Sequence, residues 1–181
     1  MHNGNKEVLI LPRLKNHYSI HEIQEIKKYQ KELPDMAHFM YYLINWQGIQ
    51  FTVFNCYELT DIIHRSLLKS YIDILFAIEY NKDTLYYSNI VESACRDLHC
   101  YIVQANTSDY GDSRCSVPKK TVEMTPVKIK GGDNDTIITF TLELKSLRDF
   151  QLQDPLFQNT NDYKNTPPGY DSRNVKNRNN S

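Results

Sequence analysis

The chain of 181 residues lacks several features that define common classes of protein. It has no run of about 18 apolar residues, so we expect no membrane-spanning helix. Residues 1–6 contain no apolar segment of the kind found in a secretory signal, and we therefore expect a cytoplasmic protein. The net charge of −1 shows neither the basic excess that favours nucleic acid as a main partner nor a solvating acidic run.

Cysteine is also scarce, with four residues at positions 56, 95, 100 and 115. Two disulfides are possible in number, but a cytoplasmic chain of this size does not need them, and we expect free thiols. The signal for a zinc site is weak. It consists of His99 and Cys100, with Cys95 and Cys115 nearby in sequence, and no second pair of closely spaced ligands follows them. We therefore predict no metal site and no cofactor.

The residues that are present suffice for one α/β domain. Hydrophobic residues make up 40% of the chain and aromatic residues 12%, enough to bury a core. Apolar periodicity predicts helices over 20–33, 58–70, 84–98 and 145–153, and strands over 8–12, 39–46, 49–55, 72–78, 100–105, 115–118, 122–130 and 136–144. Two successive strand–helix–strand units predict a sheet with helices packed on it. Residues 153–181 are polar, and we expect them to be mostly disordered.

The segment from Phe51 to Glu58 places a cysteine at a predicted strand-to-helix turn, where free backbone N–H groups can activate a thiol. Residues of strand character end at Cys56, and a helical pattern begins immediately afterward. A thiol at such a turn lies near unpaired N–H groups, whose partial positive charge favours the thiolate and can hold an oxyanion. Cys56 is therefore a candidate nucleophile. On this local pattern alone, a small buried side chain that closes a strand is the more ordinary interpretation.

A series of short motifs resembles a known family when it is taken in order. The motifs are Lys15, Cys56-Tyr57-Glu58, Asn81, Arg96-Asp97, Gln104-Ala105-Asn106 and Gly111-Asp112-Ser113-Arg114. Over about residues 8–152, their order resembles the second half of a carbon–nitrogen hydrolase of the nitrilase superfamily. Each motif is weak alone, and the joint order carries the resemblance. The runs 15–19 and 55–59 are also similar to the nitrilase-type domain fused behind some bacterial defence-associated reverse transcriptases.

The resemblance implies roles for five residues. Cys56 matches the nucleophile that attacks an amide or nitrile carbon and forms a thioester. Lys15 matches the catalytic lysine, whose ammonium stabilises the thiolate and the tetrahedral oxyanion. Glu22 falls where many members keep a second glutamate that orients the lysine or the substrate, although it also fits a helix capping box. The backbone N–H of Tyr57 would complete the oxyanion hole, and Asn81 would line the substrate pocket.

One element that the resemblance implies has no match. The general base of the family is a glutamate well upstream of the lysine. Glu7 is the only glutamate before Lys15, and at eight residues upstream it is too close to serve as this base. We therefore expect residues 1–152 to form an incomplete nitrilase-like α-β-β-α sandwich, with a missing N-terminal half or a fused upstream domain as partner. Alone, this portion would expose sheet surface and be unstable or inactive.

These implications predict hydrolysis of a non-peptide carbon–nitrogen bond in a small amide or nitrile, by a protein that forms homo-oligomers as the family does. Two alternatives stay open. A non-catalytic nitrilase-like scaffold or sensor module, belonging to an antiphage reverse transcriptase, would use the fold without the chemistry. A Cys/His dyad joining Cys56 to His17 or His21 would be a protease or acyltransferase, if Lys15 lies far away.

Overall fold

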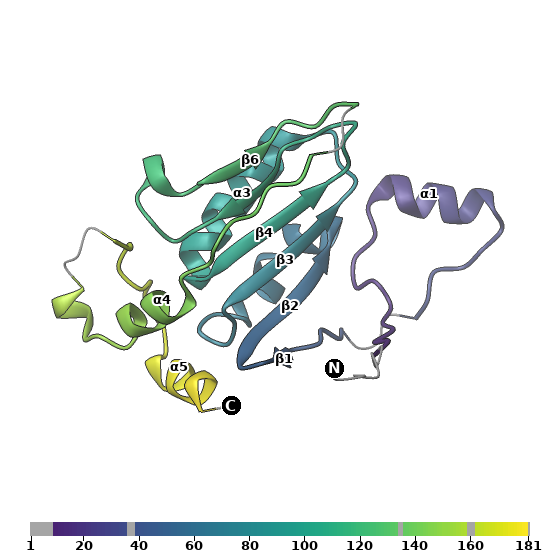
Figure 1. Cartoon of the computed structure of the whole chain (residues 1–181). Helices are drawn as coiled ribbons and strands as arrows, with labels where there is room; N and C mark the ends of the chain where they lie inside the picture. The colour runs from purple at the N-terminus through teal and green to yellow at the C-terminus, as the bar shows by residue number, and fades with distance from the viewer. Residues whose placement is uncertain (1–8, 36–38, 134–135, 159–161, 181) are drawn as a thin grey trace, which may run out of the picture. The chain divides into compact units, whose positions relative to one another are not determined.

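The computed structural model describes residues 9–35, 39–133, 136–158 and 162–180 (Figure 1). The chain divides into two compact units, Met1–Tyr41 and Tyr42–Ser181. In the first unit, α1 (Ile20–Lys28) buries none of its side chains, and the single nitrilase-like domain over residues 1–152 stays a prediction. The sheet and its core belong entirely to the second unit.

Among its described residues, the first unit contains one regular element, the well-capped helix α1. The Ser19 hydroxyl accepts a hydrogen bond from the backbone N–H of Glu22, whose carboxylate accepts one from the backbone N–H of Ser19 at 2.7 Å. This is the predicted capping box. The helix ends at Lys28 rather than Leu33, and Gln30 follows at φ 55°, which helical backbone does not adopt. Residues 9–12 form no strand, and residue 8 lies outside the described part of the chain.

The second unit is built on a six-stranded sheet whose spatial order follows the chain. Its strands are β1 (Ile44–Trp46), β2 (Ile49–Asn55), β3 (Ile74–Glu79), β4 (Tyr101–Asn106), β5 (Ser113–Ser116) and β6 (Val127–Ile129). Strands β2, β3 and β4 are parallel, and the remaining pairs are antiparallel. The predicted hairpin at Gln47-Gly48 joins β1 to β2, and β1 is shorter than the predicted strand 39–46.

Helices cover one face of the sheet. The crossovers of the parallel strands run through the short α2 (Ile62–Ser66) and the longer α3 (Thr84–Leu98), which lies behind the sheet in Figure 1. Because side chains alternate along a strand, Leu75 and Ala77 share this face, and both are fully buried. Ile74 and Phe76 point to the opposite face, into a core cluster that also contains residues before and within α4 (Leu144–Gln151).

The structure departs from the sequence-based expectation after β5. Only Val127–Ile129 of the predicted strand 122–130 joins the sheet, and a 3₁₀ turn, η2 (Thr121–Glu123), precedes it. The described part of the predicted strand 136–144 has no strand pairing before α4, although Leu142 and Leu144 pack on the core cluster. The alternating pattern therefore places Leu142 and Leu144 partly in the core without a strand partner among the described residues.

The tail expected to be disordered is partly ordered. It contains η3 (Pro155–Phe157) and α5 (Ser172–Asn179), and Val175 is fully buried. The expectation of disorder was wrong for this helix, because Arg178 of α5 pairs with the buried Asp73 and so attaches the tail to the sheet. Among the described residues, none of the helices combines the length and the apolar character needed to cross a bilayer.

Candidate functional site

Cys56 lies at a sharp turn directly after β2. Its φ is +48°, which is uncommon for a residue with a side chain and often marks a functional turn. The turn is fixed by Glu58, whose fully buried carboxylate accepts a hydrogen bond from the backbone N–H of Asn55 at 2.7 Å. The predicted strand-to-helix turn at Cys56 is therefore present, on the edge of the sheet where parallel strands end.

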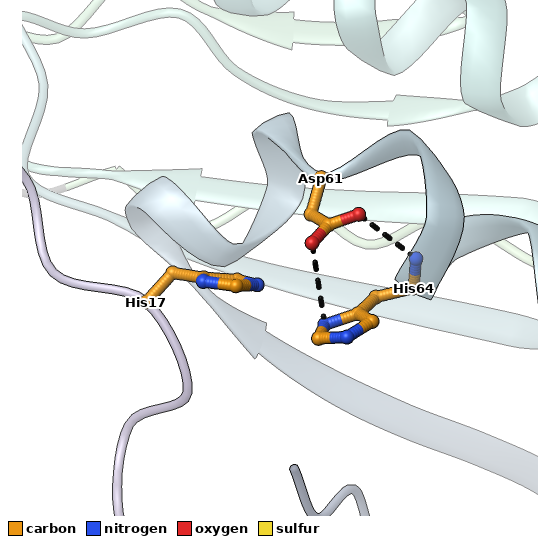
Figure 2. Close-up of side chains that lie close together, drawn as sticks. All are labelled: His17, Asp61 and His64. Carbon is orange, nitrogen blue, oxygen red and sulfur yellow. Dashed lines mark hydrogen bonds and ion pairs between the residues drawn. The ribbon is translucent and has the colours of Figure 1, made fainter. Parts of the chain in front are cut away.

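The helix after this turn is divided into two pieces. The 3₁₀ helix η1 (Cys56–Thr60) comes first, and α2 begins again at Ile62. Asp61 causes the break because it acts as a new N-cap: its Oδ1 accepts hydrogen bonds from the backbone N–H groups of Ile63, at 2.8 Å, and His64, at 3.0 Å. Its other oxygen lies 3.6 Å from Nδ1 of the His64 ring (Figure 2). The carboxylate thus holds both the backbone and the side chain of His64.

Cys56 is the most accessible of the four free thiols. Its side chain is partly exposed, whereas Cys95 and Cys100 are fully buried and Cys115 is 7% exposed. Burial raises the pKa of the Cys100 thiol to about 12 and that of Cys115 to about 11, and the pKa of Cys95 also lies well above its ordinary value. These three thiols are therefore poor nucleophiles and poor metal ligands at neutral pH.

The Cys56 thiol has a polar neighbour that sequence reasoning missed. Sγ lies 3.9 Å from the hydroxyl oxygen of Tyr87, a 4% exposed residue of α3. Burial raises the pKa of Tyr87, and the nearby Cys56 and Glu79 raise it further. The hydroxyl therefore keeps its proton, which it can donate toward sulfur. The two residues are 31 positions apart, so no local motif indicated the contact.

Glu79, the last residue of β3, is a buried carboxylic acid beside this turn. The parallel register pairs Asn55 with Ile78, so Cys56 and Glu79 follow at neighbouring strand ends. Oε2 accepts a hydrogen bond of 2.8 Å from the Gln104 side chain, while Oε1 is buried without a hydrogen-bond partner among the described residues. Burial raises the pKa of Glu79 to about 7, although Gln104 and Arg114 act in the opposite direction.

Asn81, whose role in lining the substrate pocket stays a prediction, takes part in local hydrogen bonds. Its side chain accepts a hydrogen bond from the backbone N–H of Asp83, and its backbone pairs with the Asn106 side chain at 2.8 and 2.9 Å. Asn106 also donates to the carbonyl oxygen of Gly111 at 2.9 Å. These bonds tie together the loops after β3 and β4. An open, polar cavity of about 810 Å³ lies on the Asn106 side, bordered also by Lys130.

Lys15 and Glu22, predicted as catalytic, form an ion pair within the first unit. The Lys15 side chain is 15% exposed, and its ammonium donates to Oε1 of Glu22. Partial burial raises the pKa of Glu22, but the bonds from Lys15 and Ser19 outweigh this effect and the pKa is lowered overall. Tyr57, in contrast, belongs to η1 of the second unit, and its side chain is 41% exposed. The roles of Lys15, Glu22 and the Tyr57 N–H beside the thiol stay predictions.

Comparison with known proteins finds similarity in structure rather than in sequence. No family model matches the chain, and no curated protein matches it either. Among solved structures, a CN-hydrolase superfamily protein from Xanthomonas campestris, with an arsenic adduct in its active site, aligns with a TM-score of 0.54 and 12% identity. The match covers 78% of this chain and 57% of the Xanthomonas protein.

Two structures of an amidase from Nesterenkonia sp. AN1 align less well. A cysteine-to-alanine variant of this nitrilase-superfamily amidase matches 59% of this chain and 42% of its own, with 12% identity and a TM-score of 0.45. The same kind of variant in complex with butyramide matches 57% and 41%, with 12% identity and a TM-score of 0.45. The present chain spans 57% of the length of the Xanthomonas protein and shares its fold, which confirms the predicted nitrilase-like α/β architecture.

Proposed function

We propose that this chain contributes the nucleophile for hydrolysis of a carbon–nitrogen bond in a small amide or nitrile. The observation that carries the proposal is the position of Cys56. Its thiol is partly exposed at a turn with φ +48°, at the end of a parallel strand, in a fold shared with a CN-hydrolase superfamily protein. A nucleophile at such a turn is accessible to a substrate while its backbone stays rigid.

The proposed reaction proceeds in two stages. The Cys56 thiolate attacks the carbonyl carbon of an amide, and a carbon–sulfur bond forms as the carbonyl electrons move to oxygen. The carbon–nitrogen bond then breaks, the amine leaves with a proton, and a thioester remains. Water adds to the thioester, the carboxylic acid is released and the thiol is regenerated. The Tyr57 N–H is proposed to stabilise the oxyanion, together with the ammonium of Lys15, which Glu22 orients.

The complete catalytic assembly in this proposal includes more than the present chain. The chain spans 57% of the Xanthomonas protein, and the resemblance implies an upstream glutamate as general base. That carboxylate would come from an N-terminal segment or from a fused upstream domain. We therefore propose that this chain by itself is inactive or only weakly active.

The proposed function is tested by incubating the protein, alone and joined to a nitrilase-type N-terminal segment, with a panel of small amides and nitriles that includes butyramide. We expect ammonia release and an acyl adduct on Cys56 that intact-mass spectrometry detects. Cys56→Ala should abolish both while leaving the melting temperature unchanged, since this side chain contributes little to the core. Equal ammonia release by Cys56→Ala would refute the assignment of the nucleophile.

A non-catalytic assembly module is the second candidate, and exposed apolar side chains favour it. Ile62, Ile63 and Leu67, in and directly after α2, are each at least 66% exposed. Such a cluster is typical of a surface that binds another protein, for which we propose a second copy of this chain. Ile63→Glu should then reduce the mass measured by light scattering to that of a monomer. In this reading Cys56→Ala retains both assembly and any activity of an attached reverse transcriptase.

A further inference from the structure

The face of the sheet beneath α3 carries polar groups in addition to its apolar core. Glu79 of β3, Gln104 of β4 and Arg114 of β5 are at most 7% exposed. Gln104 donates to Glu79, and the Arg114 guanidinium donates to the hydroxyl of Ser88 on α3. Buried polar groups are costly unless they are fully paired, so a group that remains unpaired here requires an explanation.

Two atoms of this group are unpaired among the described residues, Oε1 of Glu79 and Oε1 of Gln104, and the first belongs to an ionisable group. Oε1 of Glu79 has no hydrogen-bond partner among the described residues, although Glu79 is only 7% exposed. An ionised carboxylate in this position is poorly solvated, and protonation of Oε1 removes much of that penalty. The carboxyl lies at the strand end next to Cys56, and its charge acts on Tyr87, whose hydroxyl is 3.9 Å from the Cys56 sulfur.

We propose that Tyr87 and Glu79 are positioning residues of the Cys56 site: the Tyr87 hydroxyl donates a hydrogen bond to the Cys56 thiolate, and the Glu79 carboxyl, by holding or losing its proton, sets how readily that thiolate forms. The catalytic meaning of this arrangement rests on the proposed function, but the coupling of the three groups does not. No comparison or sequence motif assigned a role to either residue.

The sign of the effect follows from charge. While Glu79 is protonated and neutral, the thiol loses its proton to solvent, and the resulting thiolate gains a hydrogen bond from Tyr87. Once Glu79 ionises, a second negative charge at the neighbouring strand end is disfavoured, so the thiolate forms less readily. The charge of Arg114 opposes this effect, but its guanidinium is shared with Asp112, whose carboxylate also pairs with Lys128. The negative charge of Glu79 is therefore only partly compensated.

The experiment measures the rate at which iodoacetamide alkylates Cys56 between pH 5 and pH 10, by mass spectrometry of the peptide that contains it. In the unmodified protein, we expect the rate to rise about tenfold per pH unit, with a short flattening just above about pH 7, where Glu79 ionises, before it rises again. Glu79→Gln should remove the flattening and increase the rate above pH 7 by roughly threefold or more. Tyr87→Phe should lower the rate roughly tenfold, because the thiolate loses its donor.

Two matched controls keep helix α3 intact. Tyr86→Phe removes the hydroxyl of the neighbouring tyrosine, which is 49% exposed, and Glu92→Gln removes a carboxylate from the same helix. Both should leave the profile unchanged. The buried Cys95 and Cys100 report on folding, because they become alkylated only if a variant unfolds. If Glu79→Gln unfolds, the profile of the unmodified protein and that of Tyr87→Phe decide the question.

The outcomes separate this inference from the proposed hydrolase. A smooth single rise in the unmodified protein, or coincident profiles for Glu79→Gln and the unmodified protein, would overturn the role of Glu79. A Tyr87→Phe profile identical to that of the unmodified protein would overturn the role of Tyr87. Because alkylation needs no substrate, the coupling can be demonstrated even if every amide and nitrile in the panel proves inert, and amide hydrolysis can be found even if the coupling fails.

Discussion

The guanidinium of Arg178 in α5 lies 2.6 Å from the carboxylate of Asp73 directly before β3, and both side chains are 1% exposed. Asp73 also accepts hydrogen bonds from Arg148 of α4, at 2.9 Å, and from the backbone N–H of Gln50, at 2.9 Å. One buried carboxylate thus connects both C-terminal helices to the sheet. This relationship, across 105 positions, makes the polar tail part of the folded unit.

Arg178→Ala should strongly destabilise the second unit. It leaves Asp73 with one cation fewer in a buried site, and breaking a buried pair in this way typically costs about 3–5 kcal/mol. The free energy of unfolding in urea measures the loss. Arg173→Ala serves as the matched control, because Arg173 belongs to the same helix and pairs with Asp171 at an 85% exposed position. Equal stability of the two variants would show that the tail does not depend on Asp73.

The sequence alone could not predict this attachment, although it predicted much of the sheet. Strand character is a local property, and the Gln47-Gly48 turn and the Ser19–Glu22 capping box are encoded within four residues, so these elements were found. The pairing of Arg178 with Asp73 is visible only when the chain has folded. Composition predicted disorder because large hydrophobic residues are few in the tail, but the stabilisation comes from ion pairs instead.

For the candidate site, the sequence predicted the turn at Cys56 but not the residues that surround it. The strand pattern before Cys56 and the helical pattern after it placed the turn correctly. Tyr87 and Glu79 were not identified, because a tyrosine on a helix and a glutamate ending a strand have ordinary surface roles in most sequences. Only the parallel register of β2 with β3, and the packing of α3 over them, bring these residues to the thiol or to its neighbouring strand end.

Gly111→Ala should destabilise the loops that surround the polar cavity. Gly111 has φ +71°, and a Cβ at this position would overlap the carbonyl oxygen of Lys130. We expect a loss of about 2–4 kcal/mol, because backbone strain and steric overlap add. Gly48→Ala is the control: Gly48 has a similar φ of +77° but no heavy atom within 4 Å of its Cβ position, so only strain of about 1 kcal/mol applies. Thermal unfolding measures both, and similar losses would contradict the close approach.

Two buried groups should give the stability opposite dependences on pH. Burial lowers the pKa of His99 to about 4, while Nε2 lies 2.6 Å from the carbonyl oxygen of Lys164. The unfolded chain binds this proton near pH 6.5, so the contribution of His99 is present above pH 6.5 and is lost as the pH falls toward 4. Glu79, with a pKa raised from 4.5 to about 7, stabilises below pH 4.5 and loses this contribution as the pH rises through 7.

We therefore expect the stability of the unmodified protein to vary little between pH 4.5 and pH 6.5. Each group contributes on the order of 3 kcal/mol across its own window, and the two contributions largely cancel. His99→Gln should reveal a decline in the urea midpoint with rising pH, and Glu79→Gln should reveal an increase. If both variants have the same pH dependence as the unmodified protein, neither group titrates as its burial indicates.

Glu22→Gln should distinguish the two roles that converge on one side chain of the first unit. Oε2 of Glu22 completes the capping box with Ser19, while Oε1 holds the Lys15 ammonium. Glutamine preserves the cap, because an amide oxygen still accepts the hydrogen bond from the Ser19 N–H, but it removes the charge that orients Lys15. In the reconstituted hydrolase, we expect kcat to fall roughly tenfold or more with little change in helicity measured by circular dichroism. Ser19→Ala is the converse variant: it weakens the cap by about 1 kcal/mol and leaves the ion pair in place. If Ser19→Ala lowers kcat as much as Glu22→Gln does, Glu22 acts through the helix alone, and the prediction that it supports a catalytic lysine is wrong.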